Sequence, residues 1–164
     1  NQRLLKENGK MIPEGGEIRV ALLKDQASIR NEIFVDKVLG YDLADFNTIT
    51  GNKFDIRDTN MNFSILSEPK VAFVFDFYQK HIIHKQEKII EINVIEDGLC
   101  MGLTTWLKLN LYESIYYENN PNGHHKSHWT NPIYTFSKPL KVSKGQLIRI
   151  KATLLLDEVW YELI

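Results

Sequence analysis

The sequence has little cysteine, no block of like charge and no long hydrophobic run. Its single cysteine, Cys100, excludes an intrachain disulfide and a multi-cysteine zinc site, as is typical of a reducing compartment such as the cytoplasm. Twenty lysines and arginines against 21 aspartates and glutamates leave no net field that would draw the chain to nucleic acid or an anionic membrane. We therefore expect a soluble, cytoplasmic protein that has neither as a partner.

No apolar stretch approaches the ~18 residues of a membrane-spanning helix, and the opening NQRLLKEN lacks the apolar centre of a signal peptide. The first residue is Asn rather than Met, so the chain is either a piece of a longer protein or a complete one, and the sequence alone leaves both open. With 164 residues, 43% of them hydrophobic, the chain can bury one core. Residues 1–164 are therefore expected to form a single domain.

Alternation of apolar and polar residues is the dominant pattern. It runs through residues 99–112, where the odd positions are mostly apolar, and again through 146–156. Both segments are longer than an average strand, as in barrels and bent sheets. Further strands are predicted at 17–23, 70–78, 88–94, 132–136, 140–143 and 158–164. The predicted fold is mostly β, an antiparallel barrel or sandwich of about eight strands.

Two segments depart from this alternation. Residues 26–39 have apolar positions at helical spacing, with Asp25 as the expected N-cap and Gly40 just beyond the end, so one helix is predicted near the N-terminus. Residues 41–69 are polar, with scattered aromatic residues, and are too long for an ordinary loop. We expect this insertion to project as an arm, because Phe46, Phe54 and Phe63 have no evident place in a core.

The most informative short motif is Ser127-His128-Trp129, between two predicted strands. Such a cluster suits the edge of a pocket, although a tryptophan at a strand start is more often a core anchor with its indole N–H bonded. His124, His125 and His128 lie within five residues of one another in the sequence, and His81 and His84 are also close together, a pattern that also suggests a metal site. That spacing carries little information in a loop, and we predict no metal.

Other candidate residues have simpler interpretations. Asp76 is either a functional carboxylate or a strand-end residue that bonds a turn, and the turn is favoured. Trp106 and Trp160 are expected in the core because they sit on or beside apolar strand faces. The aromatic run Tyr112, Tyr116 and Tyr117 either packs across strands or forms a peptide-binding surface, and packing is favoured.

Several short motifs in a fixed order resemble the protein arginine methyltransferase family. Together they span nearly the whole chain, and they are NQRLLKENGKMIP at 1–13, VLGYDL at 38–43, SEP at 67–69 followed by FDF at 75–77, GLCMGLTTWL at 98–107, NP at 120–121, SHW at 127–129 and PLKVSKG at 139–145. The sequence departs from the family pattern at Ser127, which replaces a threonine, and at Thr130-Asn131, which replace a lysine and a glutamine.

The resemblance implies a C-terminal β-barrel domain whose partner is its own upstream Rossmann-like domain, which binds S-adenosylmethionine. No glycine-rich phosphate-binding turn occurs in this sequence, and the family's paired glutamates would lie upstream. The chain is therefore expected to carry no cofactor site and to be inactive alone. Residues 41–69 would form a dimerisation arm through Tyr41, Asp42, Leu43, Phe46 and Phe54, which implies a homodimer of the full-length protein.

By the same resemblance, Ser127, His128 and Trp129 would bind a protein or peptide substrate. Trp129 would line the arginine channel through stacking or a cation–π contact. His128 would support catalysis by hydrogen-bonding an acidic residue of the other domain. The alternative is a stand-alone β-barrel or sandwich that binds a peptide or sugar through residues 119–129.

Overall fold

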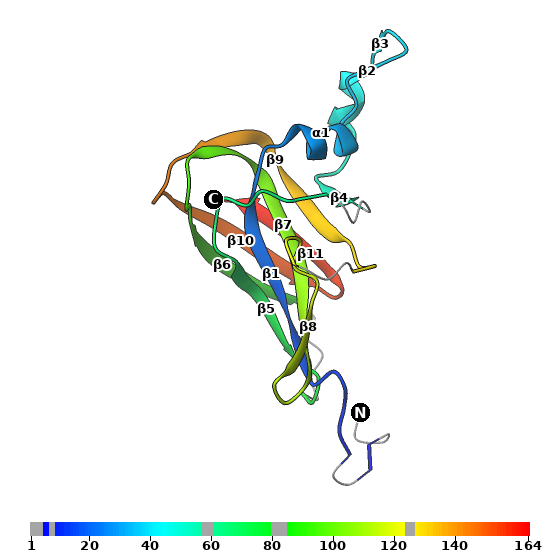
Figure 1. The fold of residues 1–164 in the computed structure, drawn as a ribbon, viewed down its shortest axis with the longest axis vertical. Helices are drawn as coiled ribbons and strands as arrows, with labels where there is room; N and C mark the ends of the chain where they lie inside the picture. Colours follow the sequence, from blue (N-terminus) through cyan, green and yellow to red (C-terminus); the bar gives the residue numbers. More distant parts are fainter. Residues whose placement is uncertain (1–4, 7–8, 57–60, 80–84, 124–126) are drawn as a thin grey trace.

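The computed structural model describes residues 5–6, 9–56, 61–79, 85–123 and 127–164, and most of them lie in antiparallel strands, as the alternation predicts. The larger sheet has the order β4-β9-β7-β1-β5, with β8 paired to β7, and the smaller has the order β11-β10-β6 (Figure 1). The strands of these sheets are β1 (Gly15–Lys24), β4 (Lys53–Ile56), β5 (Lys70–Asp76), β6 (Lys85–Asn93), β7 (Gly98–Tyr112), β8 (Ile115–Glu118), β9 (Asn131–Val142), β10 (Leu147–Leu155) and β11 (Glu158–Leu163).

The main core lies between the two sheets. Val20, Leu22 and Phe73 from the larger sheet and Ile92 and Ile150 from the smaller sheet are all at most 1% exposed and belong to one cluster. Alternate residues of each strand point inward, so the period-2 pattern directly produces this core. Among the described strands, the larger and the smaller sheet are separate antiparallel ladders and do not form one continuous sheet.

β7 organises the larger sheet, because it pairs with β1, β8 and β9. Its pairing with β9 shifts register between Cys100 and Gly102, which face Leu140 and Thr135. The structure has one strand, β9, where the sequence predicts two, at 132–136 and 140–143. The irregular pairing between these two parts explains why the sequence pattern is interrupted there. Pro139 is tolerated within β9 because it falls where the ladder is interrupted and no backbone N–H is required.

The helix is shorter than predicted. α1 spans Ala27–Ile33, its N-cap is Gln26 without a side-chain bond, and Asp25 forms an ion pair with Arg30 instead of capping. The helix cannot continue beyond Phe34, because the side chain of Asn47 takes both backbone groups of Val35, accepting its N–H at 3.0 Å and donating to its carbonyl at 2.6 Å. The predicted N-cap and C-terminus were therefore wrong.

Only the first part of residues 41–69 projects from the sheets. The projecting arm consists of the hairpin β2 (Lys37–Val38) and β3 (Tyr41–Asp42), with Gly40 at φ 88° in its turn, and the 3-10 helix η1 (Ala44–Thr48) (Figure 1). β4 returns into the larger sheet, where its residues pair with the start of β9. The expectation that the whole segment stands apart from the core was wrong.

The aromatic residues of that segment have different environments. Phe63 is only 5% exposed and belongs to a second core cluster with Leu23 and Ile29, so the prediction that it lacks a place in the core was wrong. Phe54 packs edge to face on Phe34, with ring centroids 5.8 Å apart. Phe46 remains 57% exposed on the arm, as predicted. The exposed apolar side chains of the arm are Val38, Leu39, Tyr41, Phe46 and Ile49.

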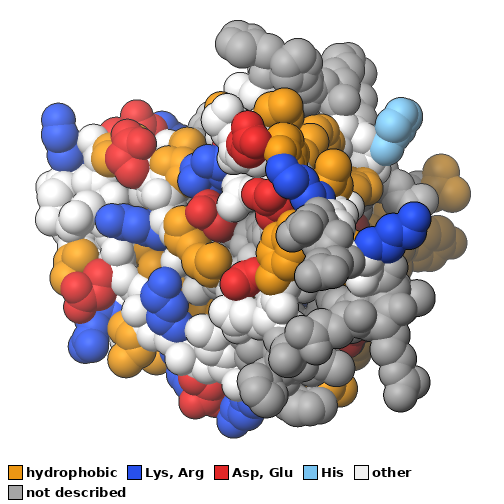
Figure 2. All heavy atoms as spheres, turned by 90° about the horizontal axis from the view of Figure 1, so that it is seen from below, with side chains coloured by type: hydrophobic (Ala, Val, Ile, Leu, Met, Phe, Trp, Pro, Cys, Tyr) orange, Lys and Arg blue, Asp and Glu red, His pale blue; other side chains and the backbone are white. Residues whose placement is uncertain are grey.

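The surface carries both charges in mixture. On the face in Figure 2, basic and acidic side chains are interspersed with apolar ones, and neither sign gathers into one area. This distribution agrees with the near balance of charges in the sequence. Among the described residues, no helix has the length and apolar character needed to cross a bilayer.

Candidate functional site

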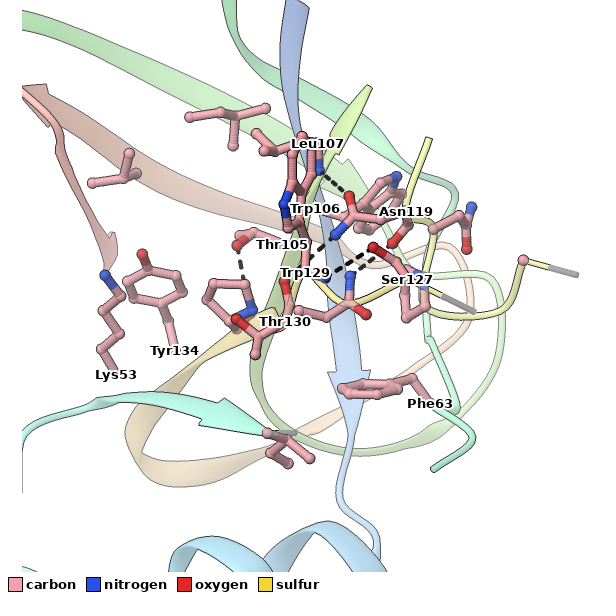
Figure 3. Close-up of a pocket in the computed structure, with 18 of the residues that line it drawn as sticks. Lys53, Phe63, Thr105, Trp106, Leu107, Asn119, Ser127, Trp129, Thr130 and Tyr134 are labelled. Atoms are coloured by element: carbon pink, nitrogen blue, oxygen red, sulfur yellow. Dashed lines mark hydrogen bonds between the residues drawn. The ribbon is translucent and has the colours of Figure 1, made fainter. Parts of the chain in front are cut away.

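A cavity of about 840 Å³ lies beside the loop that joins β8 to β9, and its volume is within the range of small-molecule and side-chain binding sites. Its walls come from distant parts of the chain: β4, residues 61 and 63, the centre of β7, residues 119–123, residues 127–134 and β11 (Figure 3). The structure brings Ser127, His128 and Trp129 together on this wall, as the motif predicts.

Trp129 stands at the edge of the cavity and is not a core residue. Its side chain is 49% exposed, and its ring meets Tyr117 edge to face at a centroid distance of 5.4 Å. Ser127 joins the two residues, because its hydroxyl accepts hydrogen bonds from the Tyr117 hydroxyl at 2.5 Å and from the Trp129 N–H at 3.0 Å. The core interpretation of Trp129 was therefore wrong, and its partly exposed indole lines the cavity.

His128 is exposed on the cavity wall and forms no hydrogen bond with the other described residues. The other four histidines of the sequence, His81, His84, His124 and His125, lie outside the described residues. Among the described residues, no three His, Cys, Asp or Glu side chains converge as a metal site would require.

The wall contributed by β7 includes a buried, hydrogen-bonded tryptophan. Trp106 is 2% exposed, which confirms its predicted core position, and its indole N–H donates to the Glu118 carboxylate at 2.8 Å. Arg19 approaches the same carboxylate oxygen at 3.5 Å and bonds Glu17 at 2.9 Å. Trp160 is 39% exposed, so the prediction that it is a core residue was wrong.

Two tyrosines that sequence reasoning missed form the deeper wall. Tyr134 and Tyr161 pack edge to face at 4.8 Å and are 5% and 6% exposed. Burial, together with the carboxylates of Asp55 and Glu158, raises the pKa of Tyr134 to about 12. Burial also raises the pKa of Tyr161, whose hydroxyl has no hydrogen-bond partner among the described residues. Both phenols therefore stay neutral at physiological pH.

The remaining aromatic and acidic candidates contact neighbouring residues. Tyr112 and Tyr116 lie against Lys10 and Lys108, with the ammonium groups 4.0 and 4.6 Å from the ring centroids. The Asp76 carboxylate accepts the Tyr78 N–H at 2.9 Å, which confirms the turn-bonding interpretation.

The described residues do not fit S-adenosylmethionine as a nucleotide-binding domain would. Such a domain places a glycine-rich turn between a strand and a helix, so that the helix N-terminus faces the ligand. Here the only described α-helix has seven residues and follows Asp25-Gln26, with no glycine in the connection from β1. We therefore assign no chemical step on this chain to that cofactor.

No protein-family model matches the chain. An arginine N(omega)-methyltransferase from Streptomyces achromogenes subsp. streptozoticus is 24% identical to it over 152 residues, which cover 92% of this chain and 41% of that protein. The predicted resemblance to protein arginine methyltransferases is confirmed. A solved structure, the Trypanosoma brucei PRMT1 enzyme-prozyme heterotetrameric complex with AdoHcy, contains a chain of the same fold. Its TM-score is 0.77 at 15% identity, over 98% of this chain and 56% of that one.

The chain thus spans less than half the length of the arginine methyltransferase that it matches. In the solved complex it matches little more than half of one chain. The likeness therefore extends over nearly all of this sequence but over only part of each relative.

Proposed function

We propose that this chain is the substrate-side and dimerisation domain of an S-adenosylmethionine-dependent protein methyltransferase that acts on arginine. The observation that carries the proposal is the half-exposed Trp129 on the wall of a cavity, within a chain related to an arginine methyltransferase. The cofactor-binding domain is assigned to a segment upstream of Asn1, and the chain alone is inactive. A cytoplasmic location belongs to the same proposal and is supported by the single, buried Cys100.

The chain's own residues hold the substrate side chain. A guanidinium is planar and cationic, and it stacks on an indole face with a gain of ~0.5–2 kcal/mol. Trp129 offers such a face, and Tyr117 and Ser127 hold its position. His128 is exposed beside it and is proposed to hydrogen-bond an acidic group of the upstream domain, which would hold the two domains in register.

Two tryptophan variants of the intact protein test this assignment. Trp129→Ala should lower kcat/KM for an arginine-containing peptide at least tenfold, because it removes the stacking surface. Trp160→Ala is the matched control, since Trp160 is also partly exposed but does not line the cavity. Equal effects of both variants, or no transfer of methyl groups by the intact protein, would contradict the proposal.

Calorimetry tests whether the upstream domain, and not residues 1–164, binds the cofactor. S-adenosylmethionine should bind the intact protein and should release no binding heat with residues 1–164 alone. Micromolar binding to the isolated chain would refute its assignment as the substrate-side half.

A further inference from the structure

The loop that carries Ser127 and Trp129 leaves β8 at Glu118 and enters β9 at Asn131. The two ends of this loop meet beside Leu107 of β7, and two asparagines form the junction. Both asparagines line the cavity. The side chain of Asn119 lies beside Leu107 at the base of the loop (Figure 3).

Asn119 fastens the first end. It is 3% exposed, and its backbone N–H donates to the Leu107 carbonyl at 3.2 Å. Its Oδ1 accepts the Leu107 N–H at 2.7 Å, so this one residue takes both peptide groups of Leu107. The Nδ2 group also points to the Thr130 carbonyl, at the long distance of 3.5 Å. A buried amide with these bonds has little freedom to move.

Asn131 fastens the second end to the first. Its Nδ2 donates to the Asn119 carbonyl at 2.8 Å, so the first residue of β9 is bonded to the residue that follows β8. Trp129 lies two residues before Asn131, and its own N–H bonds Ser127. The junction therefore determines where the loop places the indole relative to the cavity wall formed by Trp106 and Leu107.

We propose that Asn119 and Asn131 are positioning residues, an amide clamp that holds Trp129 at the cavity wall. The clamp acts through the loop that carries Trp129. Its consequence for substrate rests on the proposed function, whereas the placement of the loop does not. Because both side chains are short and Asn119 is buried, longer side chains at these positions would move the loop rather than replace the bonds.

Hydrogen exchange in the full-length protein tests the clamp without reference to activity. Asn119→Ala removes the acceptor of the Leu107 amide, so exchange at Leu107 and Trp129 should accelerate tenfold or more. Asn119→Asp keeps an acceptor oxygen and should preserve protection at Leu107. Asn131→Ala should accelerate exchange at Trp129 but leave Leu107 protected. Amides of β6 and β10 should not change in any variant.

Asn122→Ala is the matched control, since Asn122 lies in the same loop with an exposed side chain, and with the other described residues it bonds through its backbone N–H alone, to the Asn120 side chain. It should exchange as the wild type does. Wild-type protection at Leu107 and Trp129 in Asn119→Ala, or uniform acceleration over every strand, would overturn the clamp.

Kinetics connect the clamp to the substrate. Asn119→Ala should raise KM for an arginine-containing peptide about tenfold, with partial recovery in Asn119→Asp and no change in Asn122→Ala. Unchanged KM in a variant whose loop exchanges rapidly would overturn the positioning role. If the intact protein transfers no methyl group, the proposed function fails, and the exchange pattern alone decides whether the clamp places Trp129.

Discussion

At the scale of single residues, the three tryptophans show how one residue type serves different purposes. Trp106 is buried and bonded to Glu118, Trp129 is half exposed beside the cavity, and Trp160 is partly exposed on β11. Burial determines stability, because a large ring removed from the core leaves a cavity. Exposure determines availability to a ligand.

Stability measurements should separate two of these tryptophans. Trp106→Ala is expected to lower the free energy of unfolding by about 3–5 kcal/mol, the usual loss for a large buried aromatic side chain. Trp129→Ala should lower it by only ~0.5–1.5 kcal/mol, the contribution of its edge-to-face contact with Tyr117. Chemical denaturation measures both. Equal losses in the free energy of unfolding would indicate that Trp129 stabilises the fold as a core residue does.

Gly102 is required by a close approach of two strands. A Cβ atom at this position would lie 2.1 Å from the Tyr134 carbonyl oxygen, so Gly102→Ala must push β7 and β9 apart at their register shift. We expect a loss of at least about 2 kcal/mol in the free energy of unfolding, measured by denaturation. Gly51→Ala is the control, because a Cβ at Gly51 meets nothing within 4 Å. A neutral Gly102→Ala variant would show that this approach is not needed.

At the scale of elements, the arm is distinct from the sheets on which it stands. Residues 37–49, which include β2, β3 and η1, expose five large apolar side chains, whereas β4 is hydrogen-bonded into the larger sheet. Asn47 ties the base of the arm to Val35, which gives it a fixed direction. An exposed apolar surface of this kind is typical of a protein interaction site. We therefore retain the proposal of a dimerisation arm, now limited to residues 37–49.

A charge on the arm should weaken self-association. Leu39→Asp places a carboxylate at the most exposed apolar position of the arm, 93% exposed, and should raise the dimer dissociation constant of the intact protein at least tenfold. Analytical ultracentrifugation measures this change. Leu156→Asp, a 62% exposed leucine in the turn between β10 and β11, is the control and should leave association unchanged. A dimer that withstands the Leu39 variant would exclude this interface.

At the scale of the whole molecule, stability rests on a core that contains few ionisable groups. Cys100 is fully buried, and this burial raises the pKa of its thiol from 9.0 to about 11. Tyr134 is affected in the same direction, to about 12. In both residues the folded state favours the neutral form, and the unfolded chain releases its proton at a lower pH.

Stability should therefore fall on the alkaline side. Between pH 9 and about 11 the unfolded state loses the Cys100 proton while the folded state keeps it, so the free energy of unfolding decreases as pH rises. The expected loss from this residue is on the order of 1 kcal/mol per pH unit in that interval. Denaturation at pH 8, 9 and 10 measures the slope, which should become shallower in Cys100→Ala. An unchanged slope in that variant would assign the alkaline loss to other groups.

The sequence by itself determined the strands of regular alternation, the mostly β class and the order of motifs that resembles arginine methyltransferases. These properties are local, because each strand records in its own residues which face is buried. The tertiary structure decided the rest. β4 is too short to show a period and exists through its pairing with β9, and Phe63 became buried because residues 61–63 pack against α1 and β1. The cavity joins residues from Ile18 to Tyr161. The junction joins Asn119 to Leu107 and to Asn131, each 12 positions away, and no local pattern encodes such contacts.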